Sequence, residues 1–230
     1  MKRLVLLGEG HGEVSALPVL IGRLLQEKGT DNPLYLDHDV IRTSPARLVK
    51  WDKSKNQPDY SQWVARVELA ARRREVGAVL AVYDGDAKKF PAGSSFAFCA
   101  ATAAKSMAAA AASAGAGKLF SLSIVFACSE YETWLIAGAE SLAGRYLSDG
   151  RPALPRHAKF PAGNPESHGK RWLEQNCDGY RPTRDQSALT ELLDLQSVRA
   201  KKLRSFVRLE HALGQLLEAA ATNRHTSTPG

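Results

Sequence analysis

Three mainly apolar runs of residues, each followed by acidic residues, place the strongest constraint on the fold of this chain. The runs are Leu4–Leu7, Ala78–Tyr83 and Leu119–Ala127. A run without polar alternation is typical of a strand that is covered on both faces, as in a parallel sheet. Between the runs, apolar residues recur at helical spacing. Strands that alternate with helices predict an α/β fold with a mostly parallel, Rossmann-like sheet flanked by helices.

The segments between these runs predict further helices and one further strand. Apolar spacing predicts a helix over Val14–Lys28 and another over Ser61–Glu75. The segment Leu34–Ile41 alternates less cleanly and is expected to be a strand. The alanine-rich segment Phe96–Ala116 is expected to be a helix of a soluble protein and not a membrane span, because Lys105 lies in its middle and alanine has little hydrophobic drive.

The composition of the sequence changes after residue 146. Residues 1–146 are expected to form the α/β core, and the proline- and glycine-rich stretch 147–168 a long loop. Helical patterns then predict a C-terminal extension over 169–222, followed by a flexible tail over 223–230. The helices expected in the extension are Lys170–Gln175, Ser187–Leu193 and Val198–Ala221.

The chain is basic, with a net charge of +7 from 31 Lys and Arg against 24 Asp and Glu. Residues 145–230 hold 14 of the basic and 9 of the acidic residues, so most of the excess lies there. This distribution favours a polyanionic partner. Cys99, Cys128 and Cys177 lie far apart and form no CxxC pair, which argues against a disulfide framework and a zinc site. We expect a cytoplasmic protein without membrane association.

Acidic residues follow each of the three predicted strands. The pairs are Glu9 with Glu13, Asp84 with Asp86, and Glu130 with Glu132. Because ligands collect beyond the carboxyl ends of parallel strands, these acids are expected to meet in one region. Two like charges about 4 Å apart repel by about 4 kcal/mol at an effective dielectric constant near 20, so protons or a cation must compensate. Mg²⁺ or Mn²⁺ is the cation that we expect, because Mg²⁺ prefers oxygen ligands.

The turns that hold these acids are rich in glycine. In the GEGHGE stretch that begins at Gly8, the three glycines are expected to adopt positive φ and form a tight turn. In the second turn, Asp84 and Asp86 are expected to point to the same side, since side chains of a strand alternate. Gly85 between them is expected to leave room for a ligand near the backbone.

Two nucleotide-binding motifs are excluded by residue type. A dinucleotide fingerprint requires glycine where Glu13 stands, and Glu9 would face a pyrophosphate with like charge. The AGAGKLF stretch lacks the features of a phosphate-binding loop, because Ala112 replaces its first glycine and Leu119 its hydroxyl residue.

The order of these motifs resembles a known domain. A strand with Glu-Gly, here VLLGEG, followed by a strand with Asp-x-Asp, here VYDGD, resembles the Toprim domain of topoisomerases, primases and OLD-type nucleases. The second acid of EGHGE, Glu13, resembles the OLD-type version, in which both glutamates bind metal. The stretches GEGHGEVSALPVL, CSEYETWLIAG, HGKRWLE and SFVRLEHAL resemble an uncharacterised bacterial family of stand-alone Toprim-like proteins. Such chains are often encoded beside an AAA-type ATPase and are suspected of roles in phage defence or mobile elements.

This resemblance implies a set of site residues. The metal ligands that it implies are Glu9, Glu13, Asp84, Asp86 and Glu132. The catalytic residues that it implies are Glu9, Asp84, Asp86 and, as the candidate for the distal lysine of OLD-type nucleases, Lys170. The candidates for nucleic-acid binding, from the basic segments of the chain, are Lys88, Lys89, Lys201, Lys202, Arg204 and Arg208.

Each of these residues also has a plain structural interpretation. The strand-end acids could be solvated or cap helices, and Glu13 could be an ordinary acid of a first helical turn. His11 could relay a proton or lie exposed without a role. Lys88 and Lys89 could stabilise a transferring phosphoryl group or be surface lysines. The basic run that ends at Arg208 could be a solvated helix face.

The function expected from these features is that of an enzyme. We expect a phosphodiester hydrolase, a nuclease or nickase that depends on Mg²⁺ or Mn²⁺ and acts on DNA or RNA, with basic C-terminal helices on the phosphate backbone. One alternative is a non-catalytic regulatory or adaptor subunit that binds an ATPase or nucleic acid. Another is an α/β protein whose acids bind a small phosphorylated metabolite.

Overall fold

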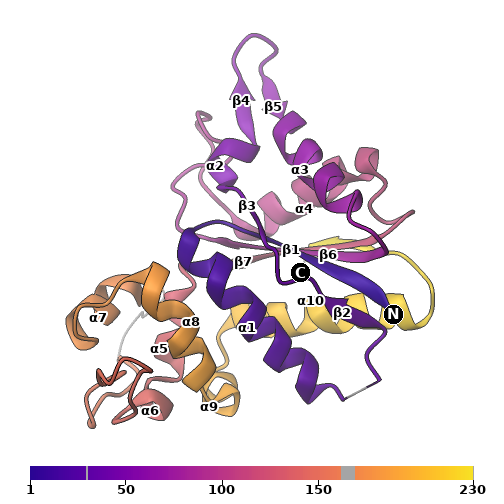
Figure 1. Cartoon of the computed structure of the whole chain (residues 1–230). Helices are drawn as coiled ribbons and strands as arrows, with labels where there is room; N and C mark the ends of the chain where they lie inside the picture. The colour runs from indigo at the N-terminus through magenta and orange to yellow at the C-terminus, as the bar shows by residue number, and fades with distance from the viewer. Residues whose placement is uncertain (30, 162–168, 230) are drawn as a thin grey trace.

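The computed structural model describes residues 1–29, 31–161 and 169–229 and contains a central parallel sheet (Figure 1). Within these residues the sheet has six strands, with β3 beside β1 and the others in the order β2-β1-β6-β7-β8. The strands are β1 (Lys2–Gly8), β2 (Leu34–Leu36), β3 (Ile41–Arg42), β6 (Val76–Asp84), β7 (Ser121–Ala127) and β8 (Ser227–Pro229). Every strand pair in this sheet is parallel, which confirms the predicted α/β class.

Helices cover both faces of the sheet and one of its ends. They are α1 (His11–Glu27), α2 (Pro45–Leu48), α3 (Ser61–Ala71), α4 (Ala100–Ala111), α5 (Glu132–Ala137), α6 (Ala139–Leu142), α7 (Gly169–Asn176), α8 (Pro182–Leu192), α9 (Leu195–Ala200) and α10 (Arg204–Ala221). A separate antiparallel hairpin of β4 (Lys50–Asp52) and β5 (Gln57–Asp59) projects from the molecule (Figure 1). No helix within the described residues is long and apolar enough to cross a membrane.

The alternation of side chains along β1 divides the core into two layers. Leu4 and Leu6 are buried on the face covered by α1 and α10, whereas Val5 and Leu7 are buried on the face covered by α3 and α4 (Figure 1). This is the period of two that a strand imposes, and it explains why Leu4–Leu7 of β1 is apolar at every position. On the second face, the indole N–H of Trp63 donates to the carbonyl of Met107 at 2.6 Å and joins α3 to α4.

The predicted strand Leu34–Ile41 is divided into β2 and β3. The first pairs with the beginning of β1 and the second with its end. Between them, one carboxylate oxygen of Asp37 accepts a hydrogen bond from the backbone N–H of Asp39 at 3.1 Å, and the other forms an ion pair with Arg3 at 3.0 Å. A local turn of this kind competes with strand pairing and interrupts the strand.

The predicted C-terminal helices are present and pack against the main core. Leu209, Leu213 and Leu216 of α10 are buried in the same cluster as α1, and α10 packs against β7 and β6. The predicted helix Val198–Ala221 is divided into α9 and α10, because Lys202 adopts a positive φ of 53°. An L-residue with this φ ends a helix.

The predicted tail contains a strand, and part of the predicted loop is buried. In place of a flexible tail over 223–230, Ser227–Pro229 forms β8, which pairs with β7. Residues 147–161 of the predicted loop are described, and Leu147 and Leu154 are buried in the core. The remainder of that loop, 162–168, and Gly230 lie outside the described residues.

Candidate functional site

Four acidic side chains from distant parts of the chain meet at the carboxyl ends of the strands. We call Glu9, Glu13, Asp84 and Glu132 the acid cluster. Glu9 follows β1, Glu13 lies in the first turn of α1, Asp84 ends β6, and Glu132 begins α5. Their charges act on one another, because the negative charge of Glu13 raises the pKa of each of the other three. The sequence-based expectation that these acids converge is therefore met for this group.

Glu9 is held by two hydrogen bonds at the end of β1. The hydroxyl of Ser44 donates to Glu9 Oε1 at 2.7 Å, and the backbone N–H of Asp84 also binds the carboxylate. Burial is the largest influence and raises the pKa of Glu9, while these two hydrogen bonds oppose it. The nearby charges of Asp86 and Glu13 raise the pKa further.

Asp84 is the most perturbed member of the acid cluster. Burial raises its pKa well above the usual range, and the charges of Glu13, Glu132 and Glu9 add to this effect. The backbone N–H of Tyr131 donates to Asp84 Oδ1 at 2.9 Å and partly opposes the shift. Burial and the neighbouring negative charges therefore favour a proton or a bound cation at this carboxyl group.

Glu132 lies against a tyrosine that the sequence did not reveal. The side chain is only 3% exposed, and burial raises the pKa of Glu132 to about 6. The hydroxyl of Tyr180, itself buried, donates to Glu132 Oε1 at 3.1 Å. Burial and the charge of Glu132 raise the pKa of Tyr180, so this phenol stays a hydrogen-bond donor at physiological pH.

Glu13 has a buried carboxylate oxygen without a hydrogen-bond partner within the described residues. Its side chain is only 8% exposed, and this oxygen is Oε2. Leaving a buried polar group without a partner costs about 1 to 3 kcal/mol, and more for a charged one. A carboxylate oxygen in this position favours a proton or a bound cation as its partner.

The glycines near the acid cluster serve close packing and not the positive φ that we expected. The backbone of Gly10 has φ −89°, and neither Gly8 nor Gly12 adopts the left-handed region. A Cβ atom at Gly10 would lie 2.2 Å from Glu13 Oε2, so only glycine lets this carboxylate fold back over the turn. At Gly85, a Cβ would lie 2.6 Å from the carbonyl of Ala127, so protein backbone fills the space that we expected a ligand to use.

Asp86 and Lys170 lie at the margin of the acid cluster. β6 ends at Asp84, and Asp86 is exposed beyond it, so the two side chains do not share one environment as expected. Lys170 is brought close by α7, since its backbone N–H donates to Glu130 Oε2 at 2.9 Å. Asp86 therefore acts on the pKa of Glu9 by its charge, whereas the backbone of Lys170 lies beside Glu130 and its side chain is exposed.

The side chains of the acid cluster have the right chemistry for a divalent metal, but their present orientation does not form a coordination site. Its donors are carboxylate oxygens, which Mg²⁺ and Mn²⁺ prefer. However, no group of three His, Cys, Asp or Glu side chains is arranged to hold a metal ion within residues 1–29, 31–161 and 169–229. Three of the four carboxylates are instead turned toward protein donors. Metal binding would therefore require these side chains to rotate.

A large basic cleft opens beside Glu9. Its volume is about 720 Å³, and Glu9 forms part of its wall. Four cationic residues line it, and we call this surface the basic cleft: Arg42, Arg47, Lys50 and Arg66. Within the part of the chain that the structure describes, none of the four side chains forms an ion pair. Unpaired cations around a cleft create a positive potential that attracts anions.

Sequence reasoning missed the basic cleft because its residues come from four separate elements. Arg42 ends β3, Arg47 lies in α2, Lys50 begins β4, and Arg66 lies in α3. Their common position depends on the pairing of β3 with the end of β1, which carries Arg42 to the strand end that precedes Glu9. A basic residue directly after a strand that pairs with β1 was the only local signal.

The predicted nucleic-acid-binding residues lie elsewhere. Lys201 forms an ion pair with Glu140 at 2.8 Å and lies over the ring of Phe160 at 5.1 Å. Lys88, Lys89 and Lys202 are exposed, and Arg204 and Arg208 line a separate pocket. None of these six residues lines the basic cleft.

Comparison with protein families places the chain in a group without an assigned activity. Residues 8–214 match a family model described as a domain of unknown function (DUF4276). The chain belongs to the DUF4276 family. No curated protein and no solved structure matches it. Every residue of the acid cluster and the basic cleft lies within the matched range 8–214.

Proposed function

We propose that this protein is a metal-dependent phosphodiester hydrolase, a nuclease or nickase with a Toprim-like site that resembles those of OLD-type nucleases. The main support is that the acid cluster and the basic cleft adjoin, because Glu9 belongs to both. Buried acids require a cation, and unpaired cations require an anion. A phosphodiester bound to a divalent metal would satisfy both requirements in one complex.

The acid cluster would hold the metal. A bound Mg²⁺ or Mn²⁺ would supply the positive charge that activates a water molecule and stabilises the leaving oxygen. Glu9, Glu13, Asp84 and Glu132 are the proposed ligands, with Asp86 at the margin. Because burial and neighbouring carboxylates raise the pKa of Asp84 and Glu132, these groups must lose protons to bind a cation. Affinity for the metal is therefore expected to rise with pH.

The basic cleft would bind the phosphates beside the scissile bond. A nucleic-acid strand places one phosphate about every 3.4 Å, so several cations along one cleft suit successive phosphates better than a single phosphate group. Contacts of this kind position a strand without reading its sequence. In this proposal Lys170 is a catalytic residue next to the cluster, and the exposed Lys88 and Lys89 extend the positive surface.

A second candidate function is a non-catalytic adaptor that binds nucleic acid or an AAA-type ATPase in phage defence or mobile-element biology. The observation that favours it is the set of hydrogen bonds that already occupy the carboxylates of Glu9, Asp84 and Glu132. Such a cluster could remain protonated and serve only the fold. A stable complex with an ATPase partner or with nucleic acid, without cleavage, would support this alternative.

The test is cleavage by the purified protein in the presence of Mn²⁺. We expect supercoiled plasmid, single-stranded DNA or RNA to be cut, and Glu13→Gln to lower the rate at least about tenfold, since it neutralises a proposed ligand. Arg47→Gln is expected to weaken nucleic-acid binding. The slope of the logarithm of the binding constant against the logarithm of the salt concentration is expected to decrease in magnitude by about 1. Arg72→Gln is the matched control, because Arg72 is exposed and lies outside the basic cleft.

Two results would overturn the proposal. One is the absence of cleavage of all three substrates with Mn²⁺ and with Mg²⁺, alone and with an ATPase partner. The other is a Glu13→Gln protein that cuts as fast as the wild type.

A further inference from the structure

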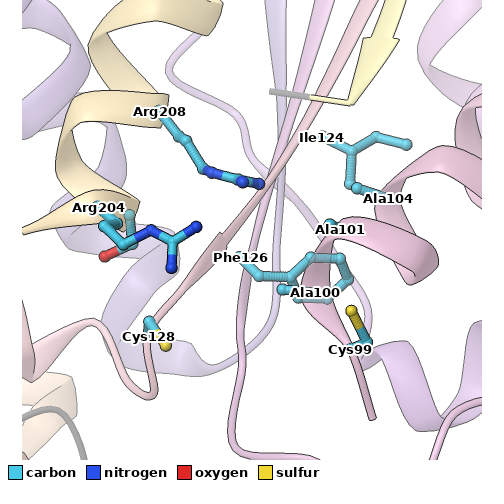
Figure 2. Close-up of a pocket in the computed structure, with 10 residues that line it drawn as sticks. Cys99, Ala100, Ala101, Ala104, Ile124, Phe126, Cys128, Arg204 and Arg208 are labelled. Atoms are coloured by element: carbon cyan, nitrogen blue, oxygen red, sulfur yellow. The ribbon is translucent and has the colours of Figure 1, made fainter.

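A second pocket lies between the beginnings of α4 and α10, apart from the acid cluster. Its volume is about 250 Å³, and its floor is the second half of β7 (Figure 2). One wall is cationic, formed by Arg204 and Arg208 of α10. The opposite side is apolar, formed by the side chains of Ile124, Phe126 and the alanines at the start of α4 (Figure 2). The pocket therefore has two chemically different ends.

The two arginines of the cationic wall have no carboxylate partner within the described residues. Arg204 and Arg208 are four residues apart, so they lie one helical turn apart on the same face of α10. Both guanidinium groups extend toward the pocket (Figure 2). Neither forms an ion pair with a carboxylate of the described residues. Two guanidinium groups on one side of a cavity are a preferred arrangement for a carboxylate or a phosphate, which they bind through paired N–H donors.

The apolar side has room because its residues are small. Ala100, Ala101 and Ala104 line it where larger residues would fill the cavity, and Phe126 presents a largely buried ring. The volume lies just below the range of about 300 to 1,000 Å³ that is typical of pockets for drug-sized ligands. The pocket thus suits a ligand smaller than a nucleotide strand.

We propose that this pocket binds a small amphipathic anion, with a carboxylate or phosphate head group on Arg204 and Arg208 and a short alkyl or similar apolar body against β7 and α4. The head group would neutralise the two arginines, and the apolar body would cover Ala100 and Ala101, the two lining alanines that are not buried. This proposal does not depend on the phosphodiesterase activity, since it uses none of the residues of the acid cluster or the basic cleft.

Cys99 provides a reporter inside the pocket. It precedes α4 and lines the cavity with an exposed side chain. Hydrogen bonds from the side chain and backbone of Thr102 lower the pKa of its thiol, and the charge of Arg208 contributes. The thiol is therefore expected to react readily with alkylating agents. Cys177 is an internal control, because burial raises the pKa of its thiol and blocks access.

The experiment measures the alkylation rate of Cys99 by iodoacetamide, followed by mass spectrometry of its peptide. Hexanoate and hexyl phosphate are the probes, and they distinguish a carboxylate from a phosphate ligand. Hexanol lacks the charge, and acetate lacks the apolar body. At a probe concentration about ten times its dissociation constant, Cys99 is expected to react about tenfold more slowly. Hexanol and acetate are expected to have little effect.

Matched variants identify the residues responsible. Arg208→Gln is expected to weaken binding of the effective probe at least about tenfold, because a charge-assisted contact is lost. Arg72→Gln changes the net charge equally and is expected to bind as the wild type does. Calorimetric titration of the effective probe gives the same comparison without the thiol, and thermal melting shows whether each variant is folded.

Three outcomes would refute the proposal. The first is that neither hexanoate nor hexyl phosphate protects Cys99. The second is that hexanol protects as well as the anions, or that Arg208→Gln binds them normally. The third is that only a single-stranded oligonucleotide protects Cys99, which would show that the arginines contact a phosphate backbone.

Discussion

Replacing Glu132 with glutamine should stabilise the metal-free protein at alkaline pH. Burial raises the pKa of Glu132 from 4.5 to about 6. Since one pKa unit corresponds to about 1.4 kcal/mol, ionised Glu132 disfavours the folded state by about 2 kcal/mol. Glutamine has nearly the same shape, and its side-chain oxygen can still accept the hydrogen bond from Tyr180. The substitution therefore removes the charge and keeps the packing.

The sign of the effect depends on pH. An acid whose pKa is raised by folding contributes its stability below the unfolded value of 4.5 and loses it as the pH rises through about 6. At pH 4 the wild type and Glu132→Gln should be about equally stable. At pH 8 in the presence of EDTA the variant should be more stable by about 2 kcal/mol, or roughly 4 to 8 °C in melting temperature for a chain of this size.

The assay is urea unfolding at several pH values, with Glu140→Gln as the matched control. Partial burial would raise the pKa of Glu140, but hydrogen bonds from Lys201 and from the backbone outweigh it and lower the pKa overall. The control should therefore be slightly less stable than the wild type above pH 5, which is the opposite sign. A Glu132→Gln protein that is less stable than the wild type at pH 8, or whose difference from it does not change with pH, would refute the reasoning.

Three further perturbations test the fold. Asp185→Asn is expected to cost about 2 kcal/mol in urea unfolding at pH 7, because the buried carboxylate pairs with Arg151 at 2.6 Å and with Arg184. Burial opposes the ionisation of Asp185, but hydrogen bonds outweigh it and lower the pKa. The stabilisation by Asp185 is therefore present at neutral pH and is lost as the pH falls below 3.8. Equal acid sensitivity of the variant and the wild type would contradict this. Gly85→Ala should cost about 1 to 3 kcal/mol, measured by thermal melting, since its Cβ would meet the carbonyl of Ala127. Removal of 223–230 should destabilise the protein, because several hydrogen bonds between β8 and β7, worth about 1 kcal/mol each, are lost. It should also increase light scattering, because the edge of β7 becomes exposed. An unchanged melting temperature would count against the role of β8.

The sequence predicted the features that depend on strong local patterns and on the geometry of a parallel sheet. β1, β6 and β7 were found because strands that are covered on both faces are mainly apolar. The meeting of Glu9 with Asp84 followed, since parallel strands end at one edge and both residues occupy such ends.

Other features depend on contacts between distant segments and could not be predicted from local patterns. β8 has the sequence Ser-Thr-Pro, which carries no strand signal, and it forms because β7 offers an open edge. Ser44, which directly precedes α2, and Tyr180, in the turn before α8, both donate to carboxylates of the acid cluster. Nothing near either residue in the sequence indicates a carboxylate partner. The turn at Gly8, Gly10 and Gly12 was predicted, but the positive φ given as the reason for its glycines was wrong. The close approach of Glu13 to Gly10 depends on the three-dimensional structure and could not be read from the sequence.

The position of α10 also has a consequence for the order in which the protein can fold. All the strands except β8 precede residue 128, yet one face of the sheet is covered in part by a helix that ends at Ala221. During synthesis the ribosome would release β1, β6 and β7 long before α10 is available to shield them from water. The apolar face of the nascent sheet must therefore remain exposed or be protected by a chaperone until nearly the whole chain has left the ribosome.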